Sequence, residues 1–402
     1  MGITVSSPES VDMSSDRLSR IQNKFQSYVD AGEAPGFITL IARKGQIVHY
    51  ETCGYRDLEK QLPIEKDTIF RIYSMTKPIT SVALMMLYEQ GKFHLFDPVS
   101  KYIPEFASIK VLQQQDGGEQ VLIEQSSPMT IHHLLTHTSG LAYDFPDDDP
   151  DEKTRATAFH IDPNISLEEK IRAIAQYPLL FQPGTRWSYS FASDVCGYLV
   201  QVLSGMPLDN FFQEHIFAPM GMVDTAFHVL DDKVSRLATL YQYDAESDSL
   251  RLHQDEGCLA RDFCVPTQSP FGGHGLVSTT EDYWKFIQML LNKGELNGTR
   301  ILGRKTVEFM SINHLKPELF PSLADFVGLG LGFGLGFAVV DDPPQTGVIN
   351  SVGTYWWGGA AATGFWIDPQ EELVAVLMTQ IRDGNLPIWE DLRATSYQAL
   401  VD

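Results

Sequence analysis

The feature that most constrains the fold of this chain is the placement of its strand-like segments, which lie near both ends and enclose a helical stretch. Near the N-terminus, residues 36–42 and 46–50 are apolar runs separated by Lys44-Gly45, which predicts a β-hairpin. Near the C-terminus the strand-like runs span residues 328–337, where glycine alternates with apolar residues, 347–352, 364–367 and 373–378. This distribution is typical of a sheet domain interrupted by a helical insertion.

Helical periodicity supports the same division of the chain. Apolar residues recur every three to four positions in several segments that end near glycine or proline, which is the signature of amphipathic helices. The predicted helices span residues 15–31, 129–140, 167–177, 194–203, 281–291 and 387–400. Four of them fall between the two groups of strands, as a helical insertion requires.

Length and composition predict a folded protein without a nucleic acid partner. The 402 residues are 43% hydrophobic and 11% aromatic, which is enough to bury a large core in one or two domains. The net charge of −22, from 52 acidic and 30 basic residues, comes without a basic cluster and argues against nucleic acid and anionic membrane surfaces. The sequence shows neither a secretion signal nor an apolar run of 18 residues, so we expect a cytosolic protein.

The cysteine and histidine spacings predict neither a metal site nor a disulfide framework. The four cysteines are scattered, and we expect reduced thiols at Cys53, Cys196, Cys258 and Cys264. His133 and His137 are four residues apart, but the glutamate of a zinc-protease motif and a third ligand are missing. We therefore expect these histidines to pack or cap, and we expect no metal and no cofactor.

The strongest chemical signal is Ser74-Met-Thr-Lys77, which is the only Ser-x-x-Lys in the chain and begins an apolar helical stretch ending at Gly91. A three-residue offset places both side chains on one helix face, about 5–6 Å apart at Cβ. A serine hydroxyl is a weak nucleophile until a neighbouring base removes its proton, and an uncharged lysine can do this. The helix start also offers N–H groups and a positive dipole end to an oxyanion.

Several ordered motifs together resemble the serine β-lactamase and penicillin-binding protein superfamily, in particular its class C-like branch with the family VIII carboxylesterases. The motifs are Ser74-Met-Thr-Lys77, residues 95–106, residues 132–141, Pro183-Gly-Thr-Arg-Trp-Ser-Tyr189, residues 272–280 and Trp357-Gly358-Gly359 before residues 365–369. They are spread across about 300 residues of the chain. The resemblance implies an α+β fold with an antiparallel sheet flanked by helices and an inserted all-helical domain. We expect residues 1–72 and 270–402 to form the sheet domain and residues 73–269 the mostly helical one, with the cleft between them.

The resemblance also implies the roles of individual residues. Ser74 would be the nucleophile, Lys77 the base that activates it, and Tyr189 the group that relays a proton to or from the leaving group. The backbone N–H groups of Ser74 and of Ala360, which follows Trp357-Gly358-Gly359, would form the oxyanion hole. The first step would yield an acyl-serine, released by water or by an acceptor alcohol.

Two departures from the lactamase pattern indicate the substrate. Lactamases carry Tyr-x-Asn and Lys-Thr-Gly where this chain has Tyr189-Ser190-Phe191 and Trp357-Gly358-Gly359. Lysine and threonine at the second motif would hold a substrate carboxylate through charge-assisted hydrogen bonds, which Trp357 cannot form. We therefore expect a small neutral ester of modest acyl size as substrate, although Arg382 would supply a cation if the fold brings it near.

Other activities remain open from the sequence. A Ser-His-Asp hydrolase would use His274 or His137, but the chain lacks Gly-x-Ser-x-Gly. A class C-type β-lactamase and an acyltransferase that passes the acyl group to an alcohol or amine would use the same Ser74. A binding or structural member of the superfamily would lack turnover, and the presence of Ser74, Lys77 and Tyr189 argues against it.

Overall fold

The computed structural model describes residues 3–115, 120–143, 165–244, 246–247, 249–255, 261–382 and 386–402. Its centre is an eight-stranded sheet in the order β12-β13-β14-β15-β16-β1-β2-β3, in which every neighbouring pair is antiparallel. The strands are β1 (Gly36–Arg43), β2 (Gln46–Asp57), β3 (Leu62–Pro63), β12 (Leu331–Phe333), β13 (Ala338–Val340), β14 (Tyr355–Gly358), β15 (Gly364–Asp368) and β16 (Leu373–Met378). The predicted α+β class with an antiparallel sheet is confirmed.

The two ends of the chain meet in the middle of this sheet. β1 pairs with β16 from Ile38↔Met378 to Arg43↔Leu373, and β1 continues into β2 through the predicted turn. All eight residues of β1 are buried, because both faces of the sheet are covered. Alternate residues of β1 serve two cores, with Leu40 in one and Ile41 in the other, as the period of a strand requires.

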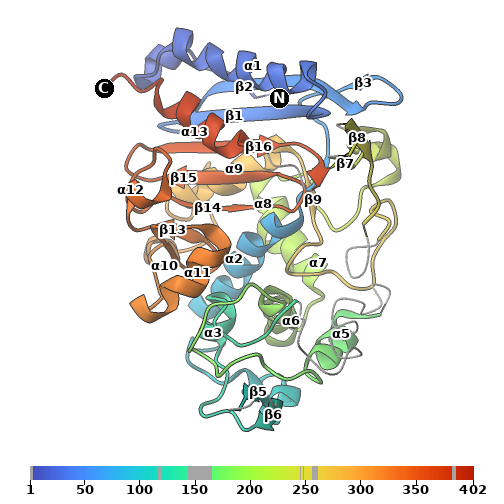
Figure 1. The fold of residues 1–402 in the computed structure, drawn as a ribbon, viewed down its shortest axis with the longest axis vertical. Helices are drawn as coiled ribbons and strands as arrows, with labels where there is room; N and C mark the ends of the chain where they lie inside the picture. The colour runs from blue at the N-terminus through green and yellow to red at the C-terminus, as the bar shows by residue number, and fades with distance from the viewer. Residues whose placement is uncertain are drawn as a thin grey trace.

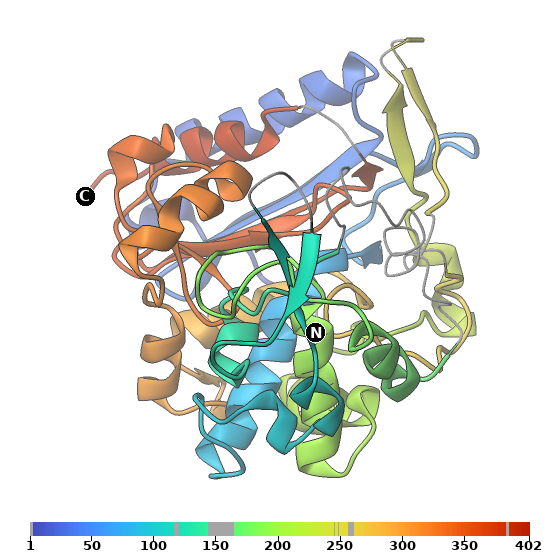
Figure 2. The ribbon, with the colours of Figure 1, turned by 60° about the horizontal axis from the view of Figure 1, so that its bottom comes forward.

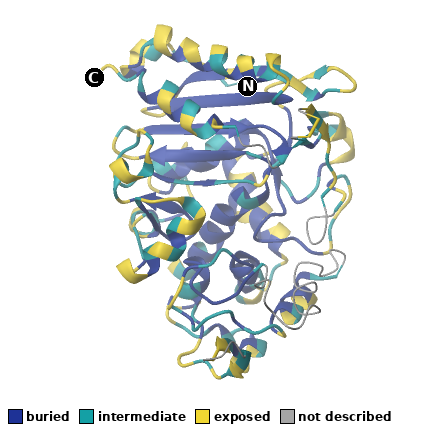
Figure 3. Ribbon diagram, in the orientation of Figure 1, coloured by how far each residue is buried: buried dark blue, intermediate teal, exposed yellow. Residues whose placement is uncertain are grey.

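Helices from both ends of the chain cover one face of the sheet. α1 (Ser15–Asp30) and α13 (Ile388–Tyr397) pack against each other and lie together on this face in Figures 1 and 2. α1 buries Leu18, Ile21 and Phe25 there. α9 (Thr280–Leu291) packs on β16 and β15 from the opposite side. Figure 3 shows the resulting buried layer between exposed outer helix surfaces.

Most of the remaining helices lie below the sheet in Figure 1, around α2 (Thr76–Glu89). They are α3 (Ile131–Leu135), α5 (Leu167–Ile174), α6 (Ala192–Ser204), α7 (Leu208–Phe212), α8 (Ala218–Met220), α10 (Arg304–Met310) and α11 (Phe320–Val327). α12 (Pro343–Thr346) lies instead at the left end of the sheet in Figure 1. Most side chains of α2 are buried, including Lys77, and the helix packs on α6. The division at residues 72 and 270 remains a prediction.

Short strand pairs complete the described part of the chain. They are β4 (Phe70–Arg71) with β9 (Val277–Ser278), β5 (Val111–Gln114) with β6 (Gln120–Ile123), β10 (Glu295–Leu296) with β11 (Thr299–Arg300), and β7 (Tyr241–Asp244) with β8 (Ser249–Leu252) and β17 (Ile381–Arg382). The pair β4–β9 matters most for function, because it joins the segment before Ser74 to the segment around residue 273.

Two strand predictions near the C-terminus were wrong. Residues 347–352 form a loop after α12, because Gly347 has φ +73° and Ile349 is 57% exposed with no neighbouring strand to cover it. Of residues 328–337 only Leu331–Phe333 is a strand, since Gly336 turns with φ +97° against Ser81 of α2. β14 was not predicted, although it carries Trp357.

The predicted helix at residues 129–140 is also shorter in the structure. Thr130 caps α3 by accepting a hydrogen bond from the N–H of His133, and the helix ends after Leu135. His137 then has φ +54°, which ends the helical path and turns its ring inward.

Cys258 lies outside the described residues, and Cys53, Cys196 and Cys264 are free thiols. No helix of the described ranges combines the length and the apolarity that a bilayer span needs.

Candidate active site

Ser74 lies in a 3₁₀ turn, Tyr73–Met75, that leads directly into α2. The turn is held from the side of β9, because the N–H of Ile72 donates to Leu276 O at 3.1 Å. Tyr73 has φ +41°, an uncommon backbone conformation for a bulky residue. The strained residue therefore immediately precedes the predicted nucleophile, where the chain changes from strand to helix.

Lys77 lies in the first turn of α2 and contacts Ser74 directly. Its Nζ lies 3.1 Å from Ser74 Oγ and donates to Gly273 O at 2.6 Å. Only 2% of the Lys77 residue surface is exposed. The amine therefore faces the serine and the 272–273 backbone, away from bulk water.

Tyr189 and Trp357 complete the cluster from two other segments. Lys77 Nζ lies 4.5 Å from the centre of the Tyr189 ring, and Trp357 Nε1 donates to Tyr189 Oη at 3.3 Å. The structure thus brings together four residues that are up to 283 positions apart in the sequence. Ser74, Lys77, Tyr189 and Trp357 were all named from the sequence, but their catalytic roles remain predictions.

Gly358 and Gly359 bring the end of β14 close to the segment before Ser74. A Cβ atom on Gly359 would lie 2.4 Å from Ile72 O and 2.3 Å from Thr363 Oγ1, so only glycine fits without a shift. The N–H of Gly359 is used by Thr363 O, whereas no backbone hydrogen bond among the described residues uses the N–H of Ala360 or Ser74. These two donors are the ones predicted for the oxyanion hole.

Sequence reasoning missed Asp194, which supports Lys77 through one peptide group. Asp194 is fully buried in the first turn of α6, and its Oδ1 accepts the N–H of Gly273 at 3.2 Å. The carbonyl of the same Gly273 accepts from Lys77. The only signal in the sequence was an acidic residue among the apolar neighbours Ala192, Val195 and Cys196.

Asp194 also lies between two buried lysines. Burial raises the pKa of its carboxyl group, whereas the charges of Lys170 and Lys77 act in the opposite direction. Lys170 is fully buried on α5, with its Nζ 3.0 Å from the centre of the Phe271 ring. Asp194 is therefore the acidic group that lies between Lys170 and Lys77 behind the serine.

The histidines considered for other mechanisms have other contacts. The His137 ring is fully buried, lies 5.0 Å from the Tyr189 ring, and has its Nδ1 3.4 Å from Ser190 Oγ. Burial and the nearby Lys77 charge hold the pKa of His137 well below its usual value, so the ring is neutral. His274 stacks on Phe271, and the His133 ring accepts the N–H of Thr130. Within the described ranges no three metal-ligating side chains cluster.

Aromatic side chains form a wall beside the serine and lysine. The Tyr189 ring lies 4.8 Å from Phe326 of α11 and 5.4 Å from Trp357, and Trp187 lies 5.6 Å from Phe333. Phe326 is 56% exposed, so the wall reaches the surface. Arg382 does not join this wall, because its Nε lies 4.0 Å from Asp255 Oδ1 and its guanidinium lies over the Tyr73 ring.

Residues 21–395 match the family model described as Beta-lactamase. The chain belongs to the β-lactamase family. It is 35% identical over 367 residues to an uncharacterized protein of Mycobacterium tuberculosis, covering 89% of each chain. It is 30% identical over 359 residues to Esterase EstB of Burkholderia gladioli, covering 86% of this chain and 85% of EstB.

The solved structures agree with the β-lactamase family assignment. A structure described as EstCE1, a hydrolase with promiscuous acyltransferase activity, superposes with a TM-score of 0.81 at 28% identity and covers 95% of this chain and 99% of its own. The resemblance inferred from the sequence motifs is therefore confirmed, including the esterase branch of the β-lactamase superfamily. The chain is a β-lactamase-related serine hydrolase.

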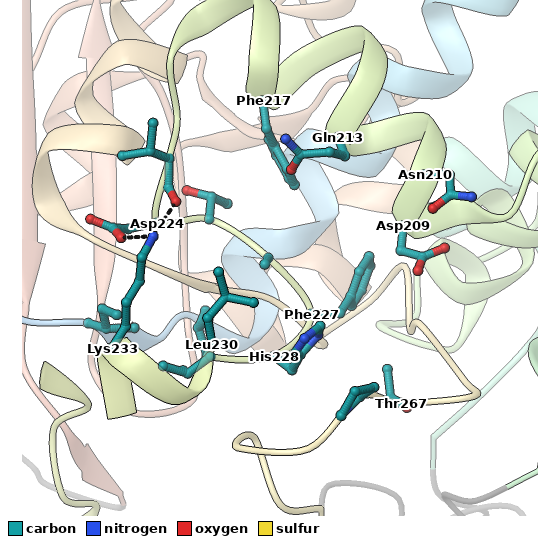
Figure 4. A pocket seen from close by; sticks show the side chains of 17 residues that line it. Asp209, Asn210, Gln213, Phe217, Asp224, Phe227, His228, Leu230, Lys233 and Thr267 are labelled. Carbon is teal, nitrogen blue, oxygen red and sulfur yellow. Dashed lines mark hydrogen bonds and ion pairs between the residues drawn. The ribbon is translucent and has the colours of Figure 1, made fainter. Parts of the chain in front are cut away.

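A separate pocket of about 380 Å³ lies away from the cluster that this β-lactamase-family chain builds around Ser74 (Figure 4). It is lined by α7, by residues 223–230 and by Thr267. Its carboxylate Asp224 is already neutralised by ion pairs to Lys233 at 2.8 Å and Arg236 at 2.6 Å. Ser74, Lys77 and Tyr189 do not line it. The candidate chemistry therefore belongs to the Ser74 cluster.

Proposed function

We propose that this protein hydrolyses small neutral carboxylic esters through an acyl-serine intermediate on Ser74. The observation that carries the proposal is the buried amine of Lys77, 3.1 Å from Ser74 Oγ and 2.6 Å from Gly273 O. A lysine amine fixed beside a serine hydroxyl can take its proton during attack. The similarity to Esterase EstB and to EstCE1 supports an ester as the substrate.

In the proposed acylation step, Ser74, Lys77, Tyr189 and the two backbone N–H groups each have a defined role. Lys77 accepts the Ser74 proton while Oγ bonds to the ester carbonyl carbon, and the N–H groups of Ser74 and Ala360 stabilise the resulting oxyanion. The bond from carbon to the alcohol oxygen then breaks. The alcohol leaves with a proton that passes from the Lys77 ammonium by way of Tyr189, whose ring lies 4.5 Å from Lys77 Nζ.

Water then releases the acid. A water molecule gives one proton to the Lys77–Tyr189 pair and adds to the acyl carbon, the bond to Ser74 Oγ breaks, and Oγ recovers the proton. An alcohol in place of water would give a new ester, which is acyl transfer. The description of EstCE1 as a hydrolase with promiscuous acyltransferase activity makes this the second candidate function.

The proposed preference for neutral esters rests on the apolar wall. Trp357, which stands where lactamases carry a lysine, donates its indole N–H to Tyr189 and has no charge to offer a substrate carboxylate. Arg382, the other cation considered, is engaged with Asp255. We therefore expect weak or absent cleavage of β-lactams.

The test is a parallel assay of a p-nitrophenyl ester, a chromogenic cephalosporin and a D-amino-acid amide with one purified sample. We expect turnover of the ester and its loss in Ser74→Ala. Ser81→Ala is the matched control, because Ser81 lies on the same helix two turns away. Ester turnover that survives Ser74→Ala would refute the nucleophile, and efficient cephalosporin cleavage would refute the substrate class. Adding a primary alcohol and quantifying the new ester measures the acyl-transfer candidate.

A further inference from the structure

Two arginines line a second cavity, which is bounded by residues 237–240 before β7, by the end of β8 with residues 253–255, and by residues 261–262. The cavity has a volume of about 570 Å³, and both Arg71 and Arg261 line it. The ring of Phe263 lies between them, 5.3 Å from the Arg71 guanidinium carbon and 4.2 Å from that of Arg261. Neither guanidinium lies within 4.0 Å of a carboxylate oxygen among the described ion pairs, although the chain carries a net charge of −22.

Of the two arginines, Arg261 has fewer hydrogen-bond partners for its guanidinium group. Its Nε, Nη1 and Nη2 are all buried and have no hydrogen-bond partner among the residues that the structure describes. Burial, reinforced by the charge of Arg71, lowers the pKa of Arg261 to about 10. A buried charge without a partner is strongly destabilising, so such a group calls for a bound counter-ion.

The two acidic groups at the cavity each have another partner, although Asp255 Oδ1 is buried without a hydrogen bond and the charge of Asp262 also acts on Arg261. Asp255 accepts the Tyr73 hydroxyl at 2.6 Å, and its Oδ1 lies 3.7 Å from His253 Nε2 and 4.0 Å from Arg382 Nε. Asp262 accepts the N–H of Cys264 at 2.8 Å. Arg71 donates to Ala238 O at 2.7 Å through Nη1, which holds its guanidinium at the cavity wall.

The rest of the wall mixes polar and apolar residues. Thr239, His253 and Gln254 are polar, and four larger apolar side chains also line the cavity: Val234, Leu237, Leu240 and Leu252. A planar guanidinium pairs with a carboxylate through two parallel hydrogen bonds, and these four apolar side chains would contact a hydrocarbon body. The chemistry therefore matches an organic carboxylate better than a small inorganic anion.

The cavity is next to the Ser74 cluster in the chain and in space. Arg71 precedes Ser74 by three residues, a span of at most about 10 Å in extended chain. Leu240 of the cavity wall packs with Tyr73 and with Ala361, which follows the predicted oxyanion residue Ala360. The cavity and the candidate active site thus share a small apolar cluster of Tyr73, Leu240 and Ala361.

We propose that this cavity binds an organic carboxylate with an apolar body, through Arg261 and Arg71. The carboxylate is either a separate molecule, such as the acid that hydrolysis of a neutral ester releases, or part of an ester bound at Ser74, in which case an acidic ester would replace the neutral ester proposed above. The second part of this statement depends on the proposed esterase function, whereas binding itself does not.

Binding is tested by isothermal titration of Ser74→Ala protein with hexanoate and with hexanamide, its uncharged counterpart. We expect saturable binding of hexanoate that is at least tenfold tighter than that of hexanamide. Adding Arg261→Gln should weaken hexanoate at least tenfold, whereas Arg304→Gln, which removes an exposed arginine on α10, should not. Equal binding of hexanoate and hexanamide by the unsubstituted cavity overturns the proposal without relying on any variant of Arg261.

Kinetic measurements with Ser74 intact distinguish a carboxylate that belongs to the substrate from one that belongs to a separate acid. The ratio of kcat/KM for the p-nitrophenyl half-ester of adipic acid to that for p-nitrophenyl hexanoate is compared before and after Arg261→Gln. A tenfold fall in this ratio assigns the site to the substrate's own carboxylate, and an unchanged ratio with lost hexanoate binding assigns it to a separate acid. Equal hexanoate binding with and without Arg261→Gln, in protein that unfolds at an unaltered temperature, overturns the proposal. Failure of the esterase proposal would appear instead as ester turnover in Ser74→Ala.

Discussion

At the scale of single residues, the cluster depends on how Lys77 is held. Its amine has one strong anchor, the carbonyl of Gly273, and the N–H of that same residue is held by the buried Asp194. The peptide group of Gly273 therefore transmits the position of Asp194 to the amine that contacts Ser74. We regard Asp194 as a positioning residue, because it does not touch Ser74.

This arrangement predicts different results for two substitutions at Asp194. Asp194→Asn keeps an oxygen that can accept the N–H of Gly273, whereas Asp194→Ala removes it. We expect Asp194→Ala to lower kcat for a p-nitrophenyl ester by about 10–100-fold with little change in KM, and Asp194→Asn to recover most of that loss. A purely structural role would instead lower the thermal stability of both variants in proportion to their lost activity.

Lys77 and Tyr189 are predicted to act as one unit with Ser74. Lys77→Ala and Tyr189→Phe should each slow acylation by orders of magnitude, measured as the single-turnover release of nitrophenol. Trp357→Phe removes the hydrogen bond to the Tyr189 hydroxyl and part of the ring that packs on Tyr189, and it should have a smaller effect. Wild-type rates in Lys77→Ala or Tyr189→Phe would remove that residue from the mechanism.

Much of the residue-level site was readable from the sequence, because Ser74, Lys77, Tyr189 and Trp357 belong to ordered motifs. Gly273 could not be read in the same way, since its contribution is a backbone carbonyl whose direction only the fold defines. Asp194 had a weak signal as an acid in an apolar helix. The partner of that acid, a peptide N–H from 79 residues away, leaves no trace in the sequence.

At the scale of elements, the site depends on a close approach between the end of β14 and the segment before α2. β14 escaped prediction because it is only four residues long and contains two tryptophans and a glycine, without the alternation of a half-buried strand. Residues 347–352 were mistaken for a strand because apolar residues there are exposed in a loop. Composition alone does not distinguish an exposed apolar loop from a strand edge.

The close approach makes Gly359→Ala a test of this element. The added methyl group would collide with Ile72 O and Thr363 Oγ1 and push β14 away from Ser74. We expect at least a tenfold loss of kcat/KM, because the oxyanion donor at Ala360 would move with the strand. Gly347→Ala is the control: a Cβ there meets no atom within 4 Å, and only backbone strain at φ +73° is added. Equal activity of the two variants would show that the end of β14 does not support the reaction.

At the scale of the whole molecule, the chain from both ends builds one sheet, and the segment between them supplies Ser74, Lys77 and Tyr189. This was predictable because the strand-like runs lie within residues 36–50 and 328–378 of the sequence and because helical periodicity dominates between them. The pairing of β1 with β16, and the paths of the connecting loops, required the three-dimensional structure.

The molecule also buries several histidines, which predicts acid sensitivity. Burial lowers the pKa of His49 and of His132 to about 4 each. Between pH 6.5 and pH 4 the unfolded chain binds protons at these positions and the folded protein does not. The contribution to stability is therefore complete above pH 6.5 and falls as pH decreases, by about 1.4 kcal/mol per pH unit for each histidine.

Denaturant unfolding at pH 7 and pH 4.5 checks this prediction. His49→Gln should reduce the difference in unfolding free energy between the two pH values, because glutamine does not titrate. Its amide can still bond Thr39 Oγ1, which lies 2.7 Å from His49 Nε2, so the buried position keeps a hydrogen bond. His94→Gln, at an exposed position, should leave the difference unchanged. The same pH dependence in all three proteins would contradict the assignment to buried histidines.

The central claim is that Ser74 is the nucleophile, and covalent labelling tests it most directly. A sulfonyl fluoride that forms a stable serine adduct is incubated with the protein, and trypsin fragments are weighed by mass spectrometry. We predict that the label is found on the fragment of residues 72–92 at Ser74, is absent from Ser74→Ala, and forms far more slowly in Lys77→Ala. Labelling of another residue at the same rate, with Ser74 unmodified, would contradict the account.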